Sequence, residues 1–177
     1  MKKLVLTLTA TVAAASLAVA GSGFDGKSSK SFKGGVPAPQ PCFSAGEAIF
    51  GLFGGYAIVD STNEGYDDSF AGGAELLYAV TNNVVIGAEY YAFSSEPAHA
   101  YNGVLQLRFP TDCLAPYVFG TVGGIVDGEN VFSVGGGAGL EYRLSPQIGL
   151  FGDGRYVYGD GGDETSVFVR AGLRFAF

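Results

Sequence analysis

The feature that most constrains the fold is a series of eight segments, each about ten residues long, in which apolar and polar side chains alternate. Turn-forming residues separate the segments, which is the pattern of successive β-strands. A tilted strand needs about 9–11 residues to cross a bilayer, and these segments have that length. The sequence therefore predicts an all-β fold, an eight-stranded antiparallel up-and-down transmembrane β-barrel over residues 48–177. The predicted strands are residues 49–59, 70–80, 84–93, 101–109, 116–125, 131–144, 147–158 and 166–177.

Charged side chains within these segments fall on one face of each strand, and apolar side chains fall on the other. An eight-stranded barrel has room inside only for its own side chains. Charges buried there must be paired, because removing a charge from water is costly. The sequence predicts a paired lumen network, with a charged ion path as the alternative. The predicted inward charges are four acids and five bases: Glu75, Glu89, Arg108, Glu141, Arg143, Asp153, Arg155, Arg170 and Arg174.

The aromatic residues distinguish a membrane barrel from a soluble sandwich, which would also show alternation. They are expected near both ends of the apolar face, on either side of an aliphatic band, as a bilayer favours. The set expected at the periplasmic end is Tyr78, Phe109, Tyr117, Tyr142, Phe175 and Phe177. The set expected toward the other end is Phe70, Tyr90, Tyr101, Phe132, Tyr156 and Tyr158.

The first twenty residues have the pattern of a cleavable signal peptide. Lys2 and Lys3 precede an uncharged run that ends in small residues, which predicts cleavage between Ala20 and Gly21. The alternative, a transmembrane helix, is disfavoured because the run is short and its second half is mostly Ala, Ser and Thr. Residues 21–47 are rich in Gly, Ser and Pro and are interpreted as a periplasmic tether.

Two cysteines, Cys42 and Cys113, remain in a chain that is predicted to be exported. An even number of cysteines in an oxidising compartment indicates a disulfide, with a pair of buried free thiols as the alternative. Cys42 precedes the first predicted strand and Cys113 lies in the turn between the fourth and fifth, so both fall on the periplasmic side. The predicted bond would hold the Pro-rich tether beneath the lumen as a partial plug.

Acidic residues dominate the predicted outer loops, which contain no Lys or Arg. Removing Lys2 and Lys3 with the signal peptide changes the formal net charge from −7 to −9, which argues against a nucleic-acid partner. Carboxylates are ligands for Ca²⁺, but their spacing matches no complete EF-hand loop, so neither a metal site nor a cofactor is predicted. The loop acids are Asp60, Glu64, Asp67, Asp68, Glu96, Asp127, Glu129, Asp160, Asp163 and Glu164.

The C-terminal part of the chain resembles a known family. The run GGGAGLEYRLSPQIGLFGDGRYVYG (residues 135–159) and the ending VRAGLRFAF are similar to the last three strands of OmpA-like outer-membrane β-barrel domains. Those barrels end on an aromatic residue, usually Phe, with apolar or aromatic residues at alternate positions before it. Phe177 occupies the terminal place, and Phe175, Leu173 and Ala171 occupy the alternate positions before it.

The resemblance implies a location in the bacterial outer membrane, surrounded by its lipid, and insertion by the barrel-assembly machinery. Phe175 and Phe177 would be the assembly signal. No peptidoglycan-binding domain is expected after Phe177, so the resemblance does not imply a role in anchoring the cell wall.

The function favoured by the sequence is that of a structural or surface-interaction barrel protein, whose surface ligand the residues do not specify. The alternatives are a narrow, low-conductance pore and, ranked last, a lipid A-modifying enzyme. Hydrolysis needs a nucleophile held beside a base. His99, the single histidine, is expected in an outer loop. The deacylase pattern requires a serine two residues away from the histidine on the same strand, and His99 has none. No catalytic site is therefore predicted.

Overall fold

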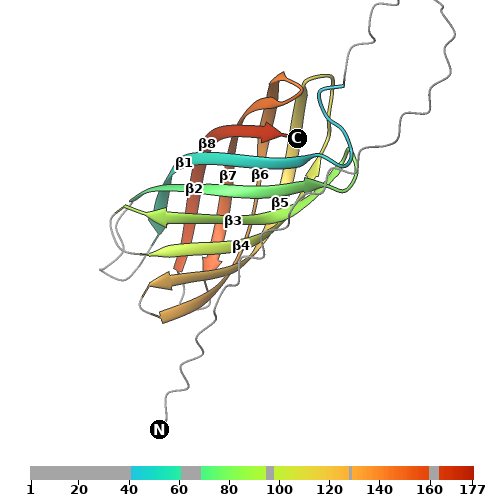
Figure 1. Cartoon of the computed structure of the whole chain (residues 1–177). Coiled ribbons are helices and arrows are strands. Elements are labelled where there is room, and N and C mark those ends of the chain that lie inside the picture. Colours follow the sequence, from blue (N-terminus) through green and yellow to red (C-terminus); the bar gives the residue numbers. More distant parts are fainter. Residues whose placement is uncertain (1–40, 61–68, 95–97, 128, 160–163) are drawn as a thin grey trace, which may run out of the picture. The chain divides into compact units, whose positions relative to one another are not determined.

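The computed structural model describes residues 41–60, 69–94, 98–127, 129–159 and 164–177, which form a closed antiparallel β-barrel (Figure 1). Each strand pairs with its neighbours in sequence, and β1 pairs with β8 to complete the ring. The predicted eight-stranded antiparallel fold is confirmed. Among these residues, no helix is long and apolar enough to cross a membrane. The strands are β1 (Ala48–Asp60), β2 (Ser69–Ala79), β3 (Val84–Phe93), β4 (His99–Arg108), β5 (Leu114–Asp127), β6 (Glu129–Ser145), β7 (Ile148–Gly159) and β8 (Glu164–Ala176).

The strand bounds differ most from the sequence prediction between β5 and β6. The predicted loop at residues 126–130 is mostly strand, because the cross-strand register continues until Asp127 lies opposite Glu129. These two acids therefore belong to strand ends rather than to an outer loop. His99 likewise is the first residue of β4, opposite Ala92 of β3, and not a loop residue.

Side chains alternate between the lumen and the outer surface along every strand, and β4 shows this with strict alternation of buried and exposed residues. The outer surface carries large apolar side chains, among them Leu52, Leu105 and Val122, which are about half exposed. Soluble monomers rarely expose so much contiguous apolar surface. The exposed face is therefore one that requires an apolar surrounding.

One predicted girdle residue, Tyr117, faces the lumen instead. It is 2% exposed, whereas its neighbours Pro116 and Val118 on β5 are exposed. The prediction failed because β5 carries apolar residues on both faces, so its alternation does not identify the inward one. The remaining predicted girdle residues occupy outward-facing positions, with Phe175 half-buried.

Both ends of the barrel chain and three tight turns lie at one mouth of the barrel. The turn between β2 and β3 is closed by the Thr81 side chain, which accepts hydrogen bonds from the amides of Asn83 (3.2 Å) and Val84 (2.9 Å). The turn between β6 and β7 is closed in the same way, because Ser145 Oγ accepts from the Ile148 amide at 3.2 Å. These turns hold the strand ends around a defined opening.

A glycine on β6 makes room for the inward tyrosine. A Cβ atom at Gly139 would lie 2.6 Å from the Tyr117 hydroxyl and 2.5 Å from Asp153 Cβ. Tyr117 donates a hydrogen bond to Asp153 Oδ2 at 2.7 Å. The absence of a side chain at Gly139 thus allows a bulky ring from β5 to reach a carboxylate on β7.

We expect Gly139→Ala to destabilise the barrel by about 1–3 kcal/mol, because the added methyl group forces Tyr117 or Asp153 out of place. Gly154→Ala is the matched control, since nothing lies within 4 Å of a Cβ built there on the outward face of β7. The measurement is the urea midpoint of folding into lipid vesicles. Equal midpoints for the two variants would contradict the packing described for Tyr117.

Candidate functional site

The lumen contains ten charged side chains joined by ion pairs into one continuous chain. Nine are the residues predicted from the sequence, and the tenth is Glu47, which precedes β1. In order from one end, the chain links Arg155, Glu89, Arg170, Glu75, Arg174, Glu141, Arg143, Glu47 and Arg108, with Asp153 as a branch on Arg170.

Arg170 on β8 is the branch point of the chain. It donates from Nε to Asp153 Oδ1 at 2.8 Å and from Nη1 to Glu89 Oε2 at 2.9 Å. Its Nη2 lies 3.4 Å from Glu75 Oε2. Glu89 also accepts hydrogen bonds from Arg155, one of them at 2.9 Å. One guanidinium thus holds three carboxylates that come from three different strands.

Arg174, two residues further along β8, continues the chain toward the mouth. It donates from Nε to Glu75 Oε1 at 2.6 Å and from Nη1 to Glu141 Oε2 at 2.7 Å. Glu75 therefore connects Arg170 with Arg174. Glu141 accepts a further hydrogen bond from Arg143 Nε. Period-two alternation places all these side chains inside, since each strand contributes them at alternate positions.

Glu47 closes the chain at the mouth. Its Oε2 accepts a hydrogen bond from Arg143 Nη2 at 3.2 Å and lies 3.6 Å from Arg108 Nη1. Arg108 also donates to the backbone oxygens of Asn82 (2.8 Å) and Ser44 (3.1 Å). Among the described residues, Glu47 is the only ion-pair partner of Arg108, whose side chain is fully buried.

The segment before Glu47 covers the same opening, and residues 42–47 are called the cap below. Phe43 is 4% exposed, and its ring centre lies 5.1 Å from Arg108 Cζ and 4.9 Å from Arg143 Cζ. A cation over an aromatic face is attracted by the ring quadrupole. The cap thus supplies both a carboxylate and an aromatic ring to the two arginines at the mouth.

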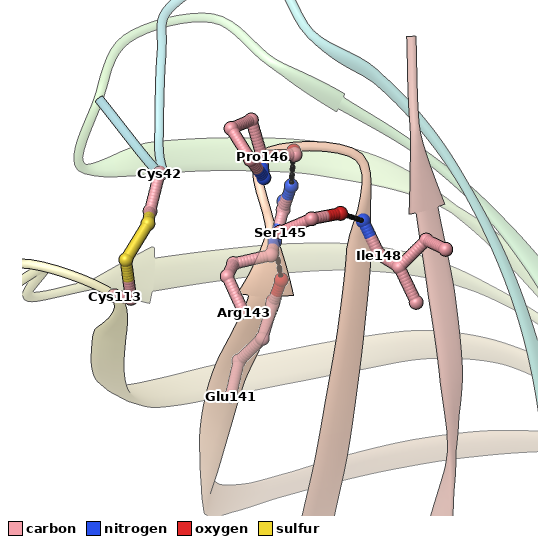
Figure 2. Close-up of a disulfide and its surroundings, with 7 residues drawn as sticks. All are labelled: Cys42, Cys113, Glu141, Arg143, Ser145, Pro146 and Ile148. Atoms are coloured by element: carbon pink, nitrogen blue, oxygen red, sulfur yellow. Dashed lines mark hydrogen bonds and ion pairs between the residues drawn. A yellow bond between two sulfur atoms is a disulfide. The ribbon is translucent and has the colours of Figure 1, made fainter. Parts of the chain in front are cut away.

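A disulfide joins the cap to the opposite side of the mouth. Cys42 and Cys113 are bonded, with their Cα atoms 5.1 Å apart. Figure 2 shows this bond beside the β6–β7 turn, where Arg143 donates to Glu141 and, at 2.8 Å, to the Pro146 oxygen. The structure therefore contains the predicted disulfide, and it places the end of the predicted tether across the lumen.

Sequence reasoning missed Glu47 because it was assigned to the tether. The signal that could have revealed it was the imbalance among the predicted inward charges, four acids against five bases. A closed lumen penalises an unpaired arginine, so the surplus base called for one more carboxylate nearby. With Glu47 the ion pairs join five acids to five bases.

Aromatic rings fill the space between the charged groups. Phe53 lies under Arg170 with 4.4 Å between its ring centre and Cζ, and Phe151 lies 4.2 Å from Arg174 Cζ in the same way. Phe119 lies 5.0 Å from Arg155 Cζ. These inward rings were not predicted, because a phenylalanine by itself does not indicate which face of a strand it occupies. The arrangement packs and neutralises charge, with no free nucleophile among the groups named.

His99 lies outside the lumen. It is exposed on the outer face of β4, with its ring stacked on Tyr90 and its Nδ1 2.8 Å from the Tyr90 hydroxyl. The predicted signal peptide, its cleavage site and the tether up to residue 40 lie outside the described residues. The loop acids also lie there or have side chains that are not described, and no group of three or more His, Cys, Asp or Glu in the described part could hold a metal ion.

The class that these features define is a closed eight-stranded barrel with an apolar outside and a charged, filled inside. No family model and no curated protein matches the sequence. Solved structures do match. The N-terminal β-barrel domain of Pseudomonas aeruginosa OprF is 16% identical with a TM-score of 0.62, covering 76% of this chain and 99% of its own.

Two further solved structures extend this result. Neisserial surface protein A has a TM-score of 0.62 at 18% identity and is covered over 99% of its length, against 75% of this chain. Ail, the attachment invasion locus protein of Yersinia pestis, has a TM-score of 0.51 at 16% identity, with 75% of this chain and 99% of Ail covered. The predicted resemblance to OmpA-like barrels is therefore confirmed at the level of the fold.

We expect Arg170→Leu to destabilise the barrel by about 3–5 kcal/mol, because it leaves three buried carboxylates without their shared partner. The adjacent substitution Val169→Leu on the outer face is the control, since Val169 is 53% exposed and should change stability by less than about 0.5 kcal/mol. Both values come from urea midpoints in lipid vesicles. Similar midpoints would indicate a lumen that is wet and screened.

Glu47→Gln tests whether the cap belongs to the lumen network. The amide keeps the shape of Glu47 but leaves Arg108 without a carboxylate, so we expect a loss of about 1–2 kcal/mol in the free energy of unfolding. Asp112→Asn is the matched control, because it removes one carboxylate from an exposed position at the same mouth. A larger loss for Asp112→Asn than for Glu47→Gln would contradict the network at the mouth.

Proposed function

We propose that this chain is a bacterial outer-membrane barrel that serves as a structural or surface-interaction protein and keeps its lumen closed. One observation carries the proposal: each inward arginine is bound to carboxylates of the same barrel or its cap, while the outward face is apolar. Such a lumen is built to stabilise the barrel. The part of the molecule left for contact with other molecules is its surface.

The outer membrane is supported by the exposed face and by the strand ends. Aromatic side chains such as Tyr78, Phe109 and Tyr142 are about half exposed on the outside of the barrel, where a bilayer interface favours them. Phe177 is 82% exposed at the C-terminus and Phe175 faces outward two residues before it. This agrees with their proposed role as the signal read by the barrel-assembly machinery.

A narrow pore is the alternative function, and the packing of the lumen argues against it. One apolar cluster includes Phe53, Tyr91, Phe151 and Phe168, and a second contains Ile49 and its neighbours, both on the lumen side of the strands. A permeating ion would have to pass these clusters and displace linked ion pairs. Each displaced pair would leave an uncompensated buried charge, which costs several kcal/mol.

Catalysis is not proposed. The solitary His99 contacts the hydroxyl of Tyr90 on the outer face, and this pair lacks the nucleophile-and-base arrangement that hydrolysis requires. A surface-interaction role places the functional residues in the acidic loops. The name of the Ail protein refers to attachment, and an attachment role in this chain would depend on its outer loops.

The test is to refold the mature chain into lipid vesicles and to record single-channel conductance and lipid A mass in parallel. We expect no stable current, because the ion-pair chain and the cap fill the lumen. The mass of lipid A should stay unchanged. Fractionation of expressing cells should recover the folded barrel in the outer membrane.

The conductance of the unmodified protein is compared with that of the double variant Arg170→Leu with Glu89→Gln, which removes linked charges from the middle of the lumen. Steady current from the unmodified protein would favour the pore, and a changed lipid A mass would favour the enzyme. Recovery of the folded protein in another compartment would overturn the proposed location.

A further inference from the structure

A cleft of about 550 Å³ opens at the mouth of the barrel and contains both bonded cysteines in its lining. Cys113 is partly exposed and Cys42 is 9% exposed. A disulfide in a closed core would be protected from reagents in solution, whereas this one borders open space. The lining includes Pro41, Cys42, Phe43, Asn82, Pro110 and Cys113.

We propose that the Cys42–Cys113 bond is a site of thiol–disulfide exchange with an external dithiol, and that its reduction opens the cap over the lumen. The proposal rests on the proposed function in one respect: the mouth must face the periplasm for a thiol oxidoreductase to reach it there. The exchange chemistry itself depends only on the cleft and the bond.

The exchange proceeds in two displacements. A thiolate of the dithiol attacks the Sγ of Cys113, which is the more exposed of the two residues. The bond to Cys42 breaks, and Cys42 leaves as a thiolate that takes up a proton. The second thiol of the reagent, as its thiolate, then attacks the reagent sulfur that is bonded to Cys113 in the mixed disulfide. Cys113 is released as a thiolate and is protonated in turn. The dithiol becomes a disulfide, losing two electrons, and the cysteine pair gains them.

Breaking the bond acts on the first part of the cap. Phe43 follows Cys42 directly, and the Ser44 oxygen accepts from Arg108 at 3.1 Å. Once Cys42 is free, residues 42–44 are held at the mouth by non-covalent contacts: this hydrogen bond, the hydrogen bond from the Ser44 amide to Glu47 Oε1 at 2.5 Å, and the packing of Phe43 against the two arginines. The bond closes a loop between residues 71 positions apart, so its loss also restores chain entropy that the closed loop had removed.

The second part of the cap is held independently. The Ala79 amide donates to the Glu47 oxygen at 2.9 Å and the Gly46 amide donates to the Ala79 oxygen at 2.7 Å, which extends the pairing of β1 with β2. Glu47 therefore stays beside Arg108 and Arg143 after reduction. Reduction should uncover Phe43 while leaving the chain of ion pairs in place.

Phe43→Trp provides a direct reporter, because the chain contains no tryptophan. The folded protein in detergent micelles is treated with dithiothreitol, free thiols are counted by alkylation and mass, and emission and acrylamide quenching are recorded. We expect two alkylated cysteines in the folded barrel, a red shift, and a severalfold rise in the quenching constant. Phe132→Trp, on the outer face at the other end, should show no change.

Cys42→Ser with Cys113→Ser, combined with Phe43→Trp, should match the reduced protein before any dithiothreitol is added. If Phe43→Trp fails to fold, thiol counting and amide hydrogen exchange of residues 43–44 on the unmodified chain provide the same two readouts. Absence of free thiols in the folded barrel, under conditions that reduce the denatured chain fully, would overturn the exchange site.

Two free thiols with an unchanged signal at position 43 would overturn the opening of the cap. Because these measurements are made in micelles, their failure is separate from failure of the proposed outer-membrane location. That location is tested by cell fractionation.

Discussion

Five buried arginines make the pairing of charge the condition on which the rest of this structure depends. A guanidinium inside a narrow barrel cannot lose its proton and cannot reach bulk water, so each one needs a carboxylate within the lumen. Among the described side chains, each of the strands β2 to β8 contributes at least one charged or polar group to the lumen. The strand register, the inward glycines and the aromatic rings then bring these groups together. Arg170 illustrates the result, since it joins Glu89, Asp153 and Glu75 from β3, β7 and β2.

The same condition explains why the segment before β1 belongs to the barrel. Arg108 and Arg143 stand at the mouth, where Glu141 is already shared with Arg174. Glu47 provides the missing charge, and Phe43 covers the two guanidiniums. The disulfide fixes this segment across the mouth. The ion pairs of the lumen and the attachment of the N-terminal segment are therefore one structural feature, and this is why we propose a structural or surface-interaction barrel rather than a narrow pore.

The errors of prediction share a physical origin in contacts between distant strands. Tyr117 was expected in the lipid-facing girdle, but it turns inward because Gly139 leaves room and Asp153 accepts its hydroxyl. Glu47 was expected in a tether, but it is held by Ala79 and by two arginines far away in sequence. In each case the local pattern was ambiguous or misleading, and a partner from another strand decided the outcome.

The sequence by itself determined the number of strands, their approximate bounds and the inward position of the nine predicted charges. These follow from period-two alternation, which is a local property of an extended chain and can be read without knowing any partner. Only the tertiary structure decided which acid pairs with which arginine, that Glu47 completes the balance, and that Phe43 covers the mouth. Those contacts depend on how the closed ring sets one strand across from another, and a one-dimensional pattern carries no information about distances across a lumen.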